Sequence, residues 1–335
     1  MKNILITSLV ILTSSSALAT TSLWDGAQTG VWGATTGWVV DGTMTPSGTP
    51  NGIDDVALFD NGSFYAGWGS ISLETAGDPA ADLDVTLGQW NQSGSSSGRH
   101  VDVRTSGSAK IIFDVSSGSA AINNSAGASS SGTTFNVEVQ LNDNLVVNPT
   151  GNTGVGYREG ITFNGLVTES GASRSITKNG IGSLSFEGTD GANTFSGGLN
   201  ITNGLVQGMK TGAFGSGNIR VEESSGTSTA SLEITDGVVD AISDSGLLYL
   251  GSFGGTNFST VALADGVNET IGGLYFDNVL QAFGTWGATG SGATFINDDW
   301  FSGTGVLTVV PEPSTYTLLL GLFVFVSIAL KRRGK

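Results

Sequence analysis

The sequence contains no cysteine and a single histidine among its 335 residues. Without cysteine the chain can form neither a disulfide nor a thiolate metal site. Nucleophilic triads, zinc sites and most general-base schemes depend on histidine. His100 follows a Ser/Gly-rich stretch, residues 93–98, so we expect it to be exposed on a loop, and no G-x-S-x-G elbow marks a partner serine. These absences argue against most hydrolase and metalloenzyme classes.

Positive charge is also scarce, with 13 Lys and Arg against 29 Asp and Glu. Between Thr20 and Val310 the counts are 8 and 28, which leaves a net charge of −20. Nucleic acids and anionic lipid headgroups bind through basic patches, so we expect neither as a partner of this region. An acidic surface of this kind favours solubility outside the cell.

The acids form four close pairs: Asp54-Asp55, Asp82 with Asp84, Glu222-Glu223 and Asp298-Asp299. A glycosidase needs two carboxylates that face each other across a sugar, whereas neighbouring residues of a strand point to opposite faces. Only Asp82 and Asp84 would share a face. The turns Asn142-Asp143-Asn144 and Asn297-Asp298-Asp299 offer oxygen ligands for weak calcium binding at most, because no EF-hand or G-G-x-G-x-D repeat is present. We therefore predict no catalytic pair, no specific metal site and no cofactor.

Glycine, by contrast, is abundant, with 52 residues, about double its usual share. Together with many Ser and Thr residues it predicts an all-β fold of short strands joined by tight turns. The clearest periodic segment, SITKNGIGSLSFEGTDGANTFSGGLNITNGLVQG, begins at Ser175. Its apolar residues recur with a period of two, which is typical of strands with one buried face.

This period predicts the core and the turns of the segment. The predicted core residues are Leu184, Phe186, Leu199, Ile201 and Leu205. We expect Ser185 to lie on the opposite, exposed face of its strand. The glycines between the strands, including Gly198, are expected to supply the positive φ that tight turns need.

The N-terminal residues have the form of a secretory signal peptide. Lys2 precedes an apolar stretch at residues 4–12, and Ala17 and Ala19 form an A-x-A cleavage site. Nine apolar residues are too few to cross about 30 Å of hydrocarbon as a helix. We therefore expect residues 1–19 to be removed on export.

The C-terminal residues predict a short transmembrane helix at about 314–330. Residues 316–330 carry no charge, and Lys331, Arg332 and Arg333 follow at once in the basic tail 331–335. Basic residues stay on the cytoplasmic side, so everything before Val310 should lie outside.

Immediately before that helix stands the motif Pro311-Glu312-Pro313. The motif, the short apolar helix and the basic tail together make residues 310–335 resemble the PEP-CTERM sorting signal of exopolysaccharide-producing Gram-negative bacteria. The resemblance implies that an exosortase, a membrane transpeptidase, recognises the motif as a partner. The membrane helix would then be a temporary anchor on the way to the cell surface or the extracellular space.

Residues 176–207 resemble the autotransporter-associated β-strand repeat. The matching positions are Lys178, Gly180, Gly182, Leu184, Phe186, 191–198 and Leu205. The resemblance implies a right-handed parallel β-helix with roughly 20 to 25 residues per coil and about a dozen coils stacked about 4.8 Å apart. Residues 74–152 match by composition and short strands alone, and a β-sandwich there would give the same pattern.

Trp24, Trp32 and Trp38 cluster near the start of the expected mature chain. Flat aromatic rings can stack on sugars, but bulky aromatic residues can equally cap the open end of a β-helical core. We therefore expect an N-terminal β module or cap at residues 20–70, in which the three rings are candidates for sugar stacking.

The sequence thus predicts a non-enzymatic, exported surface or extracellular-matrix protein with a β-helical body at residues 71–310. Exopolysaccharide is the partner that the sorting-signal resemblance implies. Two alternatives stay open: a polysaccharide lyase or hydrolase on the same fold, and a carbohydrate-binding adhesin. The enzyme would need a groove with clustered acids, an Arg or Lys base and calcium.

Overall fold

The computed structural model describes residues 19–24, 29–34, 37–40, 48–59, 68–75, 78–93, 100–125, 132–150, 160–222 and 230–310. These residues form strands and turns without a helix, which confirms the all-β class. Within these ranges no helix has the length and apolar content of a membrane span. Most of the expected signal peptide, including Ala17, and all of the predicted sorting motif, membrane helix and basic tail lie outside the described residues.

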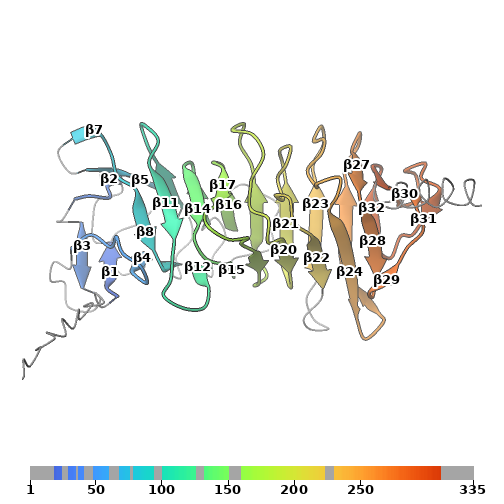
Figure 1. Cartoon of the computed structure of the whole chain (residues 1–335), viewed down its shortest axis with the longest axis horizontal. Coiled ribbons are helices and arrows are strands. Elements are labelled where there is room, and N and C mark those ends of the chain that lie inside the picture. The colour runs from blue at the N-terminus through green and yellow to red at the C-terminus, as the bar shows by residue number, and fades with distance from the viewer. Residues whose placement is uncertain are drawn as a thin grey trace, which may run out of the picture.

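Two long sheets run along the molecule, with their strands side by side down its long axis (Figure 1). The first sheet has 13 strands, in spatial order β29 (Val279–Leu280), β28 (Gly273–Phe276), β24 (Leu247–Phe253), β22 (Ile219–Glu222), β20 (Leu199–Ile201), β18 (Ile176–Lys178), β15 (Leu145–Pro149), β12 (Ala120–Asn124), β9 (Gln89–Gln92), β4 (Val56–Phe59), β1 (Thr21–Trp24) and β3 (Trp38–Val40), with β25 (Asn257–Phe258) beside β24.

The second sheet has ten strands, in spatial order β2 (Thr29–Val31), β5 (Trp68–Ser72), β10 (His100–Arg104), β13 (Gly132–Phe135), β16 (Gly160–Phe163), β19 (Ser183–Phe186), β21 (Gly204–Gly208), β23 (Ala230–Ile234), β26 (Thr260–Leu263) and β32 (Phe301–Gly303). A third, shorter sheet contains β17 (Val167–Glu169), β14 (Glu138–Leu141), β11 (Lys110–Phe113) and β8 (Val85–Leu87). A fourth contains β27 (Asn268–Ile271), β33 (Val306–Val309), β30 (Gly284–Gly287) and β31 (Phe295–Ile296), and β6 (Glu74–Thr75) pairs with β7 (Asp78–Asp82).

The strands of the two long sheets stack in parallel, one turn of chain on the next. The offset between paired residues is 20 between Leu199 and Ile219 and 32 between His100 and Gly132. A parallel partner requires the chain to return to the same edge, so the chain winds in coils. Ten strands of the first sheet, from β1 to β28, form this parallel stack in the described part of the chain, compared with about a dozen coils expected from the sequence.

The segment for which a β-sandwich was an alternative joins the same stack. Its strands β9, β12 and β15 lie in the first sheet, and β10 and β13 lie in the second. Each pairs in parallel with strands of the neighbouring coils. The described strands between residues 74 and 150 therefore do not form a separate sandwich.

The core between the sheets contains a ladder of aromatic rings, one from each successive coil. Its members are fully buried or nearly so: Trp90, Phe135, Phe163, Phe186 and Phe214. Neighbouring ring centroids are 5.1 to 5.9 Å apart. Gly208 is the register partner of Phe186, and a Cβ there would lie 2.5 Å from the Phe214 ring. Glycine at this position therefore makes room for the ring from the following loop.

Four of the predicted core residues, Leu184, Phe186, Leu199 and Ile201, are completely buried, which confirms that part of the prediction. Leu205 was wrong. In the register of β21, Val206 pairs with the buried Leu184 and fills the core, whereas Leu205 is partly exposed. A shift of one residue moves a side chain to the other face of a sheet, so Leu205 lies on the outer face of β21.

Ser185 points away from the core, as predicted, but it is not exposed. Its register partners Thr162 and Gln207 lie on the coils below and above and cover it, leaving 6% of the residue accessible. Its hydroxyl donates to Gln207 Oε1 at 3.1 Å. In a stack of coils, the outer face of a strand is thus lined by side chains from both neighbouring coils.

Between β17 and β27 the third face of the stack has no strands, and a buried polar side chain binds the backbone in their place. Asn193 is 4% exposed; its Oδ1 accepts from Val167 N at 2.9 Å and its Nδ2 donates to Ala213 O at 2.7 Å. It therefore joins the coil before it to the coil after it. This bond pattern gives a physical role to the asparagine of the GANTFSGG segment.

Glu269, in β27, also binds the backbone of a neighbouring coil, near the C-terminal end of the third face. The side chain is completely buried, and its two carboxylate oxygens accept from Ala241 N and Ile242 N, each at 3.0 Å. Burial raises the pKa of Glu269, although the two backbone amides oppose the shift. A buried acid here serves to hold two coils together.

Candidate functional site

The carboxylate pair that sequence placed on one face, Asp82 and Asp84, binds the backbone of the next coil. Asp82 Oδ2 accepts from Ser108 N at 2.6 Å, and Asp84 Oδ1 accepts from Lys110 N at 3.1 Å. The amide of Ser108 lowers the pKa of Asp82, against a smaller effect of burial. Both acids therefore act as acceptors that fix a turn. The lowered pKa of Asp82 differs from the raised pKa that a general acid requires.

Other paired acids also accept hydrogen bonds or form ion pairs within the fold. Asp54 Oδ1 accepts from Ser116 N at 2.9 Å, and Asp298 accepts from the amide and hydroxyl of Thr289, each at 2.6 Å. The hydrogen bonds from these partners lower the pKa of both acids. Glu222 forms an ion pair with Arg220 of the same strand. Asp54, Glu222 and Asp298 thus each have a structural partner, while Glu223 lies outside the described residues.

The oxygen-rich turn Asn142-Asp143-Asn144, a candidate for weak calcium binding, is bound to neighbouring coils. Asp143 Oδ2 accepts from Val115 N at 3.0 Å, and Asn144 Oδ1 accepts from Ser175 N at 2.9 Å. Among the described residues, no three or more His, Asp or Glu side chains are grouped in a way that could hold a metal ion.

His100 is buried, so the expectation of an exposed loop histidine was wrong. It is the first residue of β10 and is 3% exposed. Its Nε2 lies 2.9 Å from Thr134 Oγ1 and 3.2 Å from Asp102 Oδ1. In a catalytic triad one ring nitrogen of the histidine binds the acid and the other binds the nucleophile. In this cluster Nε2 alone contacts both Asp102 and Thr134. The cluster is a polar contact between β10 and β13.

The three candidate sugar-stacking rings lie inside the N-terminal end of the core. Trp24, Trp32 and Trp38 are at most 2% exposed, and the Trp38 ring centroid lies 5.0 Å from that of Trp24 and 4.8 Å from that of Trp32. Trp32 Nε1 donates to Pro50 O at 3.0 Å. No face of these rings is open, so a sugar could stack on them only after this end of the stack had opened.

An outer strip of aromatic residues, which the sequence reasoning missed, lies on the first sheet. Tyr249 pairs in register with Arg220 on one side and Tyr275 on the other. The guanidinium lies 4.3 Å from the Tyr249 ring centroid, and the two tyrosine rings stack 4.5 Å apart at 15°. Both faces of Tyr249 are therefore covered by neighbours, and the strip contributes to cross-strand stability.

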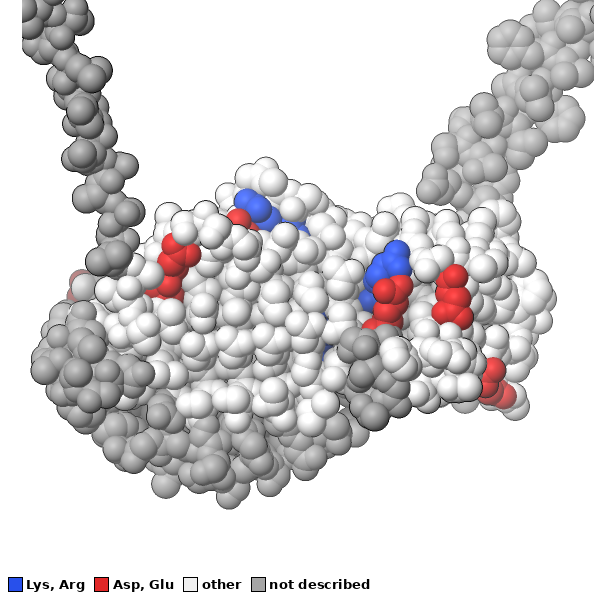
Figure 2. Space-filling model, turned by 90° about the horizontal axis from the view of Figure 1, so that it is seen from below, with Lys and Arg blue, Asp and Glu red and all other residues white. Residues whose placement is uncertain are grey.

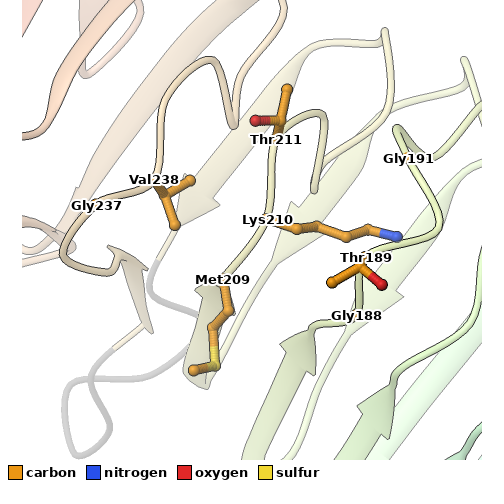
Figure 3. Close-up of a pocket in the computed structure, with 8 residues that line it drawn as sticks. All are labelled: Gly188, Thr189, Gly191, Met209, Lys210, Thr211, Gly237 and Val238. Carbon is orange, nitrogen blue, oxygen red and sulfur yellow. The ribbon is translucent and has the colours of Figure 1, made fainter.

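A pocket opens on the loops of three successive coils (Figure 3). Its volume is about 320 Å³, and its lining residues are Gly188, Thr189, Gly191, Met209, Lys210, Thr211, Gly237 and Val238. The loops are fixed by backbone bonds between coils, among them Met209 N to Phe186 O at 3.0 Å. The volume is at the lower end of the range for small-molecule sites, about 300 to 1,000 Å³.

Lys210 is the one charged residue that lines this pocket. It is 7% exposed, and its buried Nζ has no hydrogen-bond partner. Figure 3 shows its side chain running from the Met209–Thr211 loop toward Thr189. Burial lowers the pKa of Lys210, while the negative charge of Asp190 opposes the shift. No ion pair joins the two side chains in the described structure.

Lys178 provides a comparison, because it is also buried but fully bonded. Its Nζ donates to Asn179 O, Gly180 O and Asn203 O, each at 2.9 Å. Burial lowers its pKa to about 7. An ammonium group can donate three hydrogen bonds, so Lys178 is satisfied within the fold. Lys210 is not, and it is therefore the strongest candidate for contact with a ligand.

Figure 2 shows one face of the molecule, on which the described charges are few and scattered and no broad gathering of Lys and Arg is seen.

Comparisons of the chain with family models, with curated proteins and with solved structures find no match.

Proposed function

We propose that the chain is an exported, non-enzymatic protein of the cell surface or extracellular matrix. Its body is a right-handed parallel β-helix that carries the autotransporter-associated repeat, and its C-terminus is a PEP-CTERM signal processed by an exosortase. The observation that carries the proposal is the parallel stack of strands along the described body. Such a stack presents long, regular outer faces, through which it acts on its surroundings.

The use of the acids supports a structural role over catalysis. Asp54, Asp82, Asp84 and Glu269 accept hydrogen bonds from the backbone of other coils. A polysaccharide lyase or hydrolase would need acids that converge on a substrate. In the part of the chain described here, these carboxylates instead hold the stack together.

The partner that we propose is exopolysaccharide or another component of the cell envelope. A carbohydrate-binding adhesin is a second candidate, and the pocket at Lys210 is the observation that favours it. Both candidates place the body outside the cell, in agreement with the expected cleavage at Ala17 and Ala19 and with the basic residues Lys331, Arg332 and Arg333.

The sorting signal is tested by replacing Pro311, Glu312 and Pro313 with alanine in cells that produce the chain. We expect a longer, unprocessed species that stays in the inner membrane. Replacing Ser314 and Thr315 with alanine is the matched control and should leave processing intact. Unchanged processing and unchanged surface yield of the first variant would show that the motif has no sorting role.

A further inference from the structure

Three kinds of chemical group line the pocket at Lys210. The ammonium group of Lys210 is buried and lacks an acceptor, Thr189 and Thr211 supply hydroxyl groups, and Met209 and Val238 supply apolar surface. An unbonded buried ammonium is costly, so a site of this kind favours a ligand that brings a negatively charged oxygen acceptor.

The neighbouring groups define that ligand further. Thr211 Oγ1 donates to Val239 O at 2.9 Å and so keeps its lone pairs for a donor from the ligand. Asp190, the acid whose charge acts on Lys210, already places one negative charge nearby, so a ligand with a single carboxylate is favoured over one with several. A ligand with one carboxylate, several hydroxyl groups and an apolar C–H face is complementary to the ammonium, hydroxyl and apolar groups that line the pocket.

We propose that this pocket binds a sugar acid, with the carboxylate on Lys210 Nζ, hydroxyl groups on Thr189 and Thr211, and the C–H face of the ring against Met209 and Val238. The pocket has room for one such unit at about 320 Å³. The origin of the sugar acid in an acidic exopolysaccharide rests on the proposed function. The pocket itself does not depend on it.

Binding is tested with the full-length chain in a non-ionic detergent, by equilibrium dialysis against radiolabelled glucuronate. We expect saturable binding, and at least about tenfold weaker binding of glucose, which lacks the carboxylate, and of acetate, which lacks the ring. Equal binding of acetate would overturn the sugar part of the proposal and leave a small free acid as the ligand. Equal binding of glucose would overturn the role of the ammonium group.

Two variants locate the site. Lys210→Met should weaken glucuronate binding by at least about tenfold, and Thr189→Val, at an exposed loop residue, should weaken it less and leave the fold unchanged. Lys110→Met, on β11, is the matched control and should bind as the unmodified chain does. Binding that is unaffected in both pocket variants would overturn the proposal.

A separate readout distinguishes this proposal from the proposed function. Surface delivery of Lys210→Met should be normal, because the pocket plays no part in sorting. If the unmodified chain binds glucuronate through Lys210 but never reaches the cell surface, the pocket assignment stands and the proposed function fails.

Discussion

Phe186 lies in the middle of the aromatic ladder and contacts rings of the coils on both sides. Phe186→Ala should lower the free energy of unfolding by about 3 to 5 kcal/mol, because it removes buried apolar area and leaves a cavity. Thr177→Ala, on the outer face of β18, is the control and should change it by less than about 1 kcal/mol. Chemical denaturation followed by far-UV circular dichroism measures both. Equal, small effects would mean that the coils do not share a core.

Lys178 predicts a dependence of stability on pH. Burial lowers its folded-state pKa to about 7, below the value of about 10.4 in an unfolded chain. Between these values the unfolded chain binds a proton that the folded chain does not, so stability should rise with pH across this window. One such group contributes at most about 1.4 kcal/mol per pH unit.

The measurement is the urea midpoint at pH 7, 8.5 and 10 for the unmodified chain and for Lys178→Met. The variant should lose most of the rise, whereas Lys110→Met should keep it. A rise of the same size in Lys178→Met would show that another group causes it.

At the scale of single residues, the sequence predicted part of the core and missed several buried polar residues. The alternation of apolar and polar residues correctly predicted Leu184, Phe186, Leu199 and Ile201 as core. It failed at Leu205, because Leu205 and Val206 are both apolar and alternation alone does not tell which of the two pairs with Leu184. The burial of His100, Ser185 and Lys210 depends on side chains 20 or more residues away, and no local pattern reports these contacts.

At the scale of the element, the GANTFSGG segment replaces a strand with side-chain bonds. Asn193→Ala should lower the free energy of unfolding by about 2 to 5 kcal/mol, because it leaves Val167 N–H and Ala213 C=O buried without partners. Thr194→Ala, at the exposed neighbouring position, should cost less than about 0.5 kcal/mol. Denaturation curves of the two variants decide the matter, and coincident curves would refute the bridging role of Asn193.

Two glycines of the same segment separate backbone strain from crowding. Gly191 and Gly198 both have positive φ, 97° and 93°. A Cβ at Gly191 meets nothing within 4 Å, whereas one at Gly198 lies 2.5 Å from Asn218 O in the next coil. Gly191→Ala should therefore cost about 1 to 2 kcal/mol from strain alone, and Gly198→Ala should cost about 1 to 3 kcal/mol more from the clash. Similar losses in thermal unfolding would show that the next coil does not pack there.

For the whole molecule, the sequence anticipated parallel stacking, but it underestimated the length of most coils. The 20 to 25 residues expected per coil apply around the repeat, where β18, β20 and β22 follow one another closely. Elsewhere longer loops separate the strands, as between β10 and β13. Loop length hardly affects the core that the coils share, so only the strands retain a recognisable pattern.

The account of the whole molecule depends most on export. The direct test is the intact mass and N-terminal sequence of the chain recovered from the cell envelope or the medium. We predict a mature chain that begins at or near Thr20, because Ala17 and Ala19 form the expected cleavage site. Envelope or secreted protein that still carried Met1 would contradict the signal peptide, and recovery of the chain from the cytoplasm alone would contradict the proposed surface function.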